Sequence, residues 1–154
     1  MIASPVLLVE DSADEAEIMA KALRSAGVQH SLRVLRDGNE AVAYLNGEGV
    51  HADRGLHPLP AVIFLDLRLP LQSGLEVLKW IKSQSSLAQI PVIILTSSRS
   101  PEEMEAAYRL GANSYLAKPP GFREFVTMLK LTVNYWLNYN LSNFDGRDRR
   151  KPAD

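Results

Sequence analysis

Residues 61–70, AVIFLDLRLP, form an apolar run that is broken by a single carboxylate, Asp66. Five consecutive apolar residues are typical of a strand that is buried on both faces of a parallel sheet. A lone charge in such a strand costs several kcal/mol unless a cation or hydrogen-bond donors pair with it. The stretch therefore predicts a central strand and a special role for the carboxylate at its end.

Short apolar runs of this kind recur along the chain and alternate with helical segments. Strands are predicted at 6–9, 31–35, 61–65, 92–95 and 114–117. Capping boxes, each a serine with a glutamate three residues later, predict helices that begin after Ser12 and after Ser100. Further helices are predicted at 38–46, 74–83 and 122–137. This alternation predicts a doubly wound α/β fold, with a parallel sheet, right-handed crossovers and helices on both faces.

The composition bounds the number of domains and excludes several functions. A chain of 154 residues is about the size of one domain. The absence of cysteine excludes disulfides, a thiolate nucleophile and a cysteine-based zinc site. The 17 basic and 18 acidic side chains give a net charge of −1, so we expect no nucleic-acid or membrane partner. No signal peptide or membrane span is apparent, and we expect a cytoplasmic protein.

Two segments depart from the regular alternation. Residues 47–60 contain glycine and proline and are predicted to form a surface loop. The main domain is expected to span 1–137, followed by an extension at 138–154 that is either flexible or packed on the last helix through Leu141 and Phe144. The three histidines are predicted to be solvated: His30, His51 and His57.

Polar side chains that suit phosphoryl chemistry follow the predicted strands. They are Glu10, Asp11, Asp66, Thr96 and Lys118. In an open parallel sheet, ligands bind beyond the carboxyl ends of the strands, so these residues are expected to share one edge. Three carboxylates repel one another unless a cation is present, and oxygen ligands without sulfur favour Mg²⁺, or Mn²⁺, over zinc. Lys118 and Thr96 suit the oxygens of a phosphoryl group, which makes Asp66 a candidate nucleophile.

Four short motifs carry a resemblance to a known family: VEDS, FLDLRLP, ILTSS and YLAKPP. Thr96, Tyr115 and Lys118 follow Asp66 by 30, 49 and 52 residues. Over residues 5–137 this set resembles the receiver domain of two-component response regulators. The resemblance implies a flavodoxin-like sheet of strand order 2-1-3-4-5 with five helices. It also implies that Asp66 accepts a phosphoryl group, and Gly74 matches a glycine that the family has eight residues later.

The resemblance also assigns roles to the residues around Asp66. The implied metal ligands are Asp11 directly, Glu10 through a water, Asp66, and the backbone carbonyl of Arg68. The implied switch residues are Thr96, Tyr115 and Lys118. The Lys118–Pro119 peptide bond is expected to be cis, as in the family. Glu10 stands where the family more commonly has an aspartate.

The implied function is signalling, with no enzymatic activity beyond assisting the protein's own phosphorylation and dephosphorylation. A sensor histidine kinase would phosphorylate Asp66 with Mg²⁺, and the output would be an interaction with an unknown downstream protein, because no output domain is expected. The long 47–60 connection and the sequence NYWLN resemble the single-domain regulators that serve bacterial phytochrome kinases. A phytochrome is therefore the kinase that the resemblance implies.

Three other functions use parts of this pattern. A haloacid-dehalogenase-like phosphatase or phosphotransferase also has an aspartate nucleophile, but it needs a second aspartate two residues later, where this chain has Arg68. A flavin or dinucleotide binder of the same fold needs a glycine- or hydroxyl-rich phosphate loop after the first strand, whereas VEDSADEAE is acidic. A degenerate receiver that acts only as a scaffold would lack part of the site, which is complete here.

Two further features lead to hypotheses about regulation. Arg68 is expected either to swing over the site and slow or steer the loss of the phosphoryl group, or to face solvent. The last predicted helix carries a second apolar stripe, Met128, Leu131 and Tyr135. Because a helix that is apolar on two faces usually has two neighbours, this stripe predicts a homodimer interface, unless the chain end covers it.

Overall fold

The structure, a computed structural model, describes residues 4–141. Its centre is a five-stranded sheet in the order β2-β1-β3-β4-β5, and every neighbouring pair of strands is parallel. The strands are β1 (Val6–Val9), β2 (Leu32–Leu35), β3 (Val62–Leu65), β4 (Val92–Thr96) and β5 (Ser114–Ala117). The predicted flavodoxin-like sheet and its strand order are confirmed.

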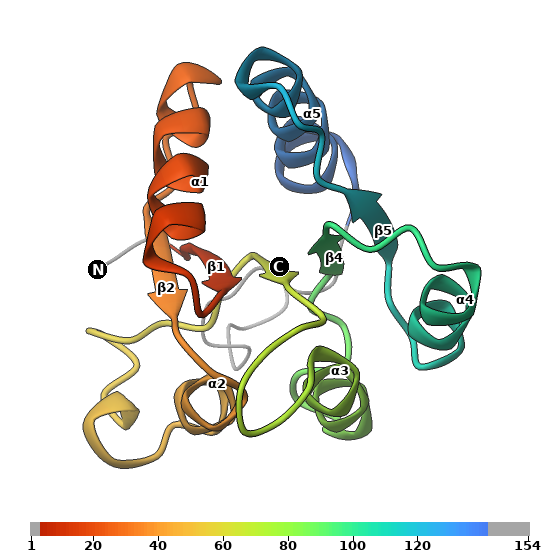
Figure 1. The fold of residues 1–154 in the computed structure, drawn as a ribbon. Coiled ribbons are helices and arrows are strands. Elements are labelled where there is room, and N and C mark those ends of the chain that lie inside the picture. The colour runs from red at the N-terminus through yellow and green to blue at the C-terminus, as the bar shows by residue number, and fades with distance from the viewer. Residues whose placement is uncertain (1–3, 142–154) are drawn as a thin grey trace.

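Helices cover both faces of this sheet. They are α1 (Ala13–Ser25), α2 (Gly38–Asn46), α3 (Gly74–Ser83), α4 (Pro101–Arg109) and α5 (Phe122–Asn134). In Figure 1, α1 and α5 lie on one side of the sheet, and α2 and α3 lie on the other. Within residues 4–141, no helix combines the length and the apolar character that crossing a membrane requires. The helices on both faces of the parallel sheet (Figure 1) confirm the predicted doubly wound arrangement.

The strands send alternate side chains into two cores, which explains their continuous apolar sequence. In β3, Ile63 and Leu65 belong to the core beneath α2 and α3. Val62 and Phe64 belong to the core beneath α1 and α5. All four side chains are at most 1% exposed, and burial of each contributes about 2 kcal/mol. A charged residue is therefore accommodated only where the strand ends, at Asp66.

Side-chain caps fix where the helices begin. The hydroxyl of Ser12 accepts a hydrogen bond from the backbone N–H of Glu15 at 3.2 Å, and that of Ser100 accepts one from Glu103 at 3.3 Å. These bonds satisfy N–H groups that the first helical turn leaves unpaired. The predicted starts of α1 and α4 are confirmed, and both first turns lie beyond the carboxyl ends of the strands.

The last helix differs from the prediction of a single helix over 122–137. α5 ends at Asn134 and continues as a π-helical turn, Tyr135–Tyr139. The wider turn is closed by the N–H of Asn140, which donates to the carbonyl of Tyr135 at 2.6 Å. Leu141 is 97% exposed, and Phe144, the other residue expected to cover α5, lies outside the described residues.

The 47–60 connection is tied to the end of α2 by Arg54. Its guanidinium donates to the carbonyls of Tyr44 and Leu45 at 2.8 and 2.7 Å. These carbonyls belong to the last turn of α2, beyond the regular hydrogen bonds of the helix interior. The Tyr44 carbonyl also accepts from the N–H of Gly47 at 3.1 Å. The connection also contains a 3₁₀ turn, Gly49–His51. One arginine thus gives a long surface loop a defined path.

Two of the three histidines pack in this loop, so the prediction that they are solvated is wrong. The ring of Tyr44 lies 5.1 Å from the ring of His51 and 6.1 Å from that of His57, between centroids. Nη1 of Arg33, on β2, donates to Nδ1 of His57 at 3.1 Å. These residues are far apart in the sequence, and the loop contacts α2 and β2 only in the folded chain. The sequence pattern therefore does not predict that they pack together.

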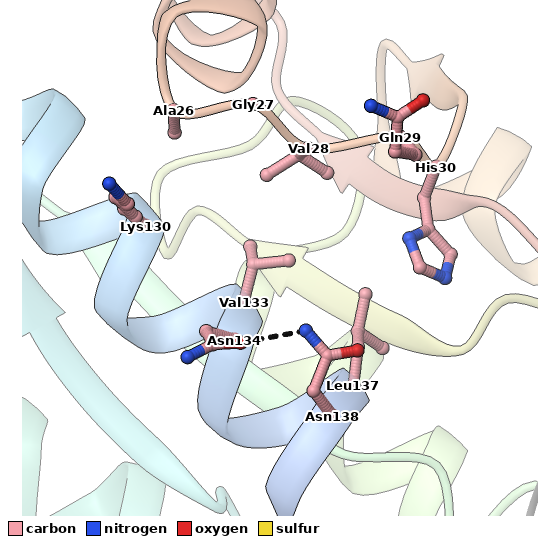
Figure 2. A pocket seen from close by; sticks show the side chains of 10 residues that line it. All are labelled: Ala26, Gly27, Val28, Gln29, His30, Lys130, Val133, Asn134, Leu137 and Asn138. Carbon is pink, nitrogen blue, oxygen red and sulfur yellow. Dashed lines mark hydrogen bonds between the residues drawn. The ribbon is translucent and has the colours of Figure 1, made fainter.

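The third histidine, His30, is partly buried and lines a cavity of about 270 Å³ between the α1–β2 connection and the end of α5. Lys130 also lines this cavity (Figure 2). Asn134 and Asn138 line it as well, and Nδ2 of Asn138 donates to Oδ1 of Asn134 at 2.7 Å. Both α1 and α5 reach their C-terminal ends here. The cavity therefore lies at the amino ends of the strands, opposite the edge that carries Asp66.

Gly74, at the start of α3, allows that helix to pack directly on the backbone of Asp66. Its N–H donates to the carbonyl of Leu67 at 2.9 Å. A Cβ at this position would overlap the carbonyl oxygen of Asp66 and lie 2.6 Å from the Cα of Leu67. Because both atoms belong to the backbone, they cannot move aside as a flexible side chain does.

We therefore expect Gly74→Ala to lower the free energy of unfolding by about 1–3 kcal/mol, the usual cost of overpacking. The measurement is urea denaturation of the variant and the wild type. Gly55→Ala is the matched control, because the nearest atom to its Cβ would be the carboxylate end of Asp53 at 3.1 Å. Equal losses in the two variants would contradict the close packing of α3 on Asp66.

Candidate functional site

Parallel register brings the residues that follow β1, β3 and β5 to one edge of the sheet. Val9 lies opposite Leu65, and Thr96 lies opposite Ala117. Glu10, Asp66 and Lys118 are the next residues after three of these positions. They therefore leave the same edge of the sheet, as predicted, Glu10 and Asp66 from adjacent strands and Lys118 from β5, on the far side of β4.

Lys118 joins the carboxylates at this edge. Its Nζ lies 2.8 Å from Oε1 of Glu10, 3.5 Å from Oδ2 of Asp66 and 3.6 Å from Oε2 of Glu15. The side chains of Lys118, Asp66 and Glu10 are only 15%, 13% and 4% exposed. Burial lowers the pKa of Lys118, but the hydrogen bond to Glu10 and the charges of Asp66, Glu10 and Glu15 outweigh burial and raise that pKa above its ordinary value. The ammonium is therefore fully charged at neutral pH.

Thr96 and Tyr115 both contact Ser98, in the connection between β4 and α4. Thr96 is 1% exposed, and its hydroxyl oxygen accepts a hydrogen bond from the N–H of Ser98 at 3.2 Å. The Tyr115 hydroxyl donates to the carbonyl of Ser98 at 3.1 Å. Two of the three predicted switch residues, Thr96 and Tyr115, are thus coupled through the backbone of Ser98.

The backbone of Arg68 contacts Asp66, whereas its side chain points away from Asp66. Its N–H donates to Oδ1 of Asp66 at 3.1 Å. Its Nη2 lies 3.4 Å from Oε1 of Glu103, in the first turn of α4, and the Arg68 side chain is 75% exposed. Of the two expectations for Arg68, an exposed arginine matches this structure, with Glu103 as its partner.

The structure does not gather all the carboxylates that the sequence places at this edge. Asp11 is exposed, and its backbone carbonyl accepts a hydrogen bond from Nη2 of Arg36 at 3.5 Å. Among residues 4–141, no three Asp, Glu or His side chains are placed to hold a metal ion. The donor type nevertheless fits a hard cation, because Glu10 and Asp66 offer carboxylate oxygens. In this structure these oxygens face the ammonium of Lys118.

The Lys118–Pro119 peptide bond is trans, and no cis peptide bond occurs within residues 4–141. The expectation of a cis bond is therefore wrong for this structure. The preference for trans before proline is about 0.5–1 kcal/mol. Lys118 reaches Glu10 at 2.8 Å with the bond in the trans form, so the ion pair does not require the cis isomer.

The chain matches a known protein family over most of its length. The model of the response regulator receiver domain matches residues 6–130. This chain belongs to the response regulator receiver domain family. The resemblance that the four sequence motifs carry is thus confirmed.

Two regulators are similar to this receiver domain over most of its length. Response regulator Rcp1 of Synechocystis sp. is 36% identical over 132 residues, which cover 86% of this chain and 88% of Rcp1. The probable methanogenesis regulatory protein FilR2 of Methanothrix harundinacea is 39% identical over 137 residues, which cover 89% of this chain and 86% of FilR2. Both matches extend over nearly the whole length of the relative.

Several solved structures are also similar to this receiver domain. The phosphorylated cyanobacterial phytochrome response regulator RcpA has a TM-score of 0.83 at 34% identity and covers 91% of this chain and 98% of its own. The bacteriophytochrome response regulator AtBRR has a TM-score of 0.71 at 40% identity, with 86% and 94% covered. The Mn²⁺-bound form of Rcp1 has a TM-score of 0.79 at 34% identity, with 90% and 98% covered. The narrower resemblance to regulators of phytochrome systems is therefore confirmed.

Sequence reasoning missed three residues that contact the site of this receiver domain: Glu15, Ser98 and Glu103. Glu15 approaches Lys118 because α1 begins directly above the carboxyl end of β1. Its place in the capping box at the start of α1 is a signal that could have located it at this edge. Glu103 occupies the same position in the capping box of α4.

We expect Lys118→Met to destabilise the receiver domain by about 3 kcal/mol, because the variant leaves the buried carboxylate of Glu10 without its cation. Since the pKa of Lys118 is raised, the contribution of the pair is complete below the ordinary lysine value of 10.5 and is lost as the pH rises through the raised value. The difference in unfolding free energy from the wild type should therefore be constant between about pH 6 and pH 9.

Lys79→Met, at an exposed position of α3, is the control for this experiment. Its effect should stay within about 0.5 kcal/mol, as for most surface substitutions. The measurement for both variants is urea denaturation across the pH range. A loss in Lys118→Met no larger than in the control would contradict the role of Lys118 as the buried partner of Glu10.

Proposed function

We propose that this chain is a phosphorylation-activated response regulator and that Asp66 accepts the phosphoryl group from a sensor histidine kinase. The observation that carries the proposal is the position of Asp66 at the carboxyl end of β3, with Nζ of Lys118 3.5 Å from its Oδ2. A carboxylate oxygen of Asp66 would form a bond to phosphorus while the bond from phosphorus to the imidazole nitrogen of the kinase breaks. Lys118 would then balance part of the added negative charge.

Mg²⁺ is the proposed metal ion of this reaction, and Mn²⁺ is an alternative. Its proposed ligands are Asp11, Asp66 and the backbone carbonyl of Arg68, with Glu10 acting through a water. All of them supply oxygen, which is the donor that both ions prefer. When bound, a divalent ion supplies positive charge that neutralises the oxygens of the transferred group. The Mn²⁺-bound form of the similar Rcp1 supports this assignment.

The proposed output runs through Thr96 and Tyr115. A phosphoryl group on Asp66 adds negative charge and strong hydrogen-bond acceptors close to the buried Thr96 hydroxyl. Movement of that hydroxyl toward the phosphoryl group would break its bond with Ser98, whose carbonyl holds the Tyr115 hydroxyl. Tyr115 would follow, and the surface formed by α4, β5 and α5 would change for a downstream protein.

The proposed kinase is of the phytochrome type, and the proposed setting is the cytoplasm, with no nucleic-acid or membrane partner. The similarity to RcpA and AtBRR, which are described as regulators of phytochrome systems, supports the choice of kinase. Residues 1–137 would form the receiver domain and 138–154 an extension. A haloacid-dehalogenase-like enzyme is disfavoured, because Arg68 stands at the position of its general acid and directs its guanidinium to Glu103.

Incubation with acetyl phosphate and Mg²⁺ should add one phosphoryl group to the wild-type protein. The added mass should be stable in acid and labile in base, as for an acyl phosphate, and intact-protein mass spectrometry measures it. Asp66→Asn should remove the gain, because the amide is not a nucleophile for this reaction. Omission of Mg²⁺ is the matched control. A gain that persists in Asp66→Asn would refute Asp66 as the phosphoacceptor.

A homodimer through the outer face of α5 is proposed as a second property. Leu131, on α5, and Tyr135, the first residue of the π-helical turn that follows, are 67% and 52% exposed. Met128, predicted for the same stripe, is partly buried against the core beneath α1 and α5. Its contribution to an interface would therefore be smaller than that of Leu131 and Tyr135.

We expect Leu131→Glu to weaken this dimer about tenfold or more, because the charge would be desolvated in the contact. Sedimentation velocity over a range of concentrations, with and without acetyl phosphate, measures the change. Val50→Glu is the control, since Val50 is 79% exposed and lies in the 47–60 connection. A wild-type protein that sediments only as a monomer in both states would exclude the dimer.

A further inference from the structure

Ser98 is a hub that connects two of the switch residues, Thr96 and Tyr115, to α4. Its N–H donates to the Thr96 hydroxyl at 3.2 Å, and its carbonyl accepts from the Tyr115 hydroxyl at 3.1 Å. Its own hydroxyl donates to Oε1 of Glu103 at 3.0 Å. The same oxygen of Glu103 lies 3.4 Å from Nη2 of Arg68. Oε1 of Glu103 thus links Ser98 to Arg68.

The Arg68–Glu103 pair is weak in the unphosphorylated protein. The two side chains are 75% and 32% exposed, and exposed ion pairs contribute little to stability because water screens them. The backbone N–H of Arg68 is hydrogen-bonded to Oδ1 of Asp66 at 3.1 Å, so the Arg68 side chain originates next to the phosphoacceptor. A guanidinium in this position can exchange one anionic partner for another at low cost.

A phosphoryl group would be the stronger partner for Arg68. It carries about 1.5 to 2 negative charges near neutral pH, whereas the Glu103 carboxylate carries one. It also presents three acceptor oxygens, two of which a guanidinium can bind at once. The charge difference therefore favours transfer of Arg68 from Glu103 to the phosphoryl group.

We propose that Glu103 is the partner of Arg68 in the unphosphorylated state and competes with the phosphoryl group on Asp66 for its guanidinium. The inference rests on the proposed function and adds a regulatory role for α4. Arg68 bound to the phosphoryl group shields phosphorus from water. Hydrolysis needs that access, because a water oxygen must bond to phosphorus while the bond from phosphorus to the Asp66 oxygen breaks, which releases inorganic phosphate and restores the carboxylate. Glu103 thereby shortens the lifetime of the phosphorylated state. Because Glu103 belongs to α4, the contacts of this helix depend on whether Asp66 carries a phosphoryl group.

The experiment follows the loss of the phosphoryl group after acetyl phosphate is removed, by intact-protein mass spectrometry in the presence of Mg²⁺. Glu103→Gln should slow dephosphorylation about two- to fivefold, the range that corresponds to the strength of an exposed ion pair. The amide oxygen can still accept from Ser98, so the hub is retained in this variant. Arg68→Ala should lose the phosphoryl group about twofold faster than the wild type or more.

Two controls isolate the competition. Glu102→Gln changes the neighbouring carboxylate in the same helical turn, whose Oε2 accepts from the Ser100 hydroxyl, and it should dephosphorylate as the wild type does. The double variant Arg68→Ala with Glu103→Gln should match Arg68→Ala alone. High salt should reduce the difference between Glu103→Gln and the wild type, because it screens the exposed pair.

Two results would overturn the inference alone: equal rates in Glu103→Gln and the wild type, or a Glu103→Gln effect of unchanged size in the Arg68→Ala background. Absence of any phosphoryl uptake by the wild type would instead overturn the proposed function together with this inference. The uptake measurement on the wild type therefore separates the two failures.

Discussion

The ammonium of Lys118 makes the arrangement of carboxylates at the edge of the sheet possible. Strands β1 and β3 are apolar and parallel, and their register places Glu10 and Asp66 next to each other at the end of the buried core. Two such carboxylates repel each other unless a cation lies between them. Lys118 is 108 residues from Glu10 in the sequence, so this cation arrives only when β5 has joined the sheet. The ion pair thus links the first strand to the last and depends on the complete fold.

The fold was predictable because its signals are local. The buried runs of β1, β3 and β4 have the length and continuity of central strands, and the serine caps of α1 and α4 mark helix starts by chemistry within four residues. The path of the 47–60 connection was not predictable, because Arg54 holds it through carbonyls of α2 and the rings pack on Tyr44. Contacts of that kind depend on where a loop returns, which spacing along the chain does not encode.

The site was predictable to the extent that topology determines it. Asp66, Glu10 and Lys118 follow parallel strands, so topology places all three at one edge of the sheet. The direction of each side chain was harder to predict. Asp11 comes directly after Glu10, yet it is exposed while Glu10 is 3% exposed. The partners of Thr96 and Tyr115 were also not apparent, because both hydroxyls meet the backbone of Ser98 in the β4–α4 connection. Glu103 of α4 in turn accepts from the Ser98 hydroxyl.

The distribution of rigidity in the structure indicates where a change of charge at Asp66 would act. The backbone beneath Asp66 is held by the β3 ladder and by α3, which packs on it at Gly74 without space for a Cβ. Close-packed interiors of this kind transmit strain and do not absorb it. The groups that can reorient are exposed or hydrogen-bonded singly: Arg68 on Glu103, and Thr96 and Tyr115 on Ser98. In the proposed phosphorylated state, the response would therefore pass to the β4–α4 connection, because the sheet edge is fixed and single hydrogen bonds through Ser98 join it to α4.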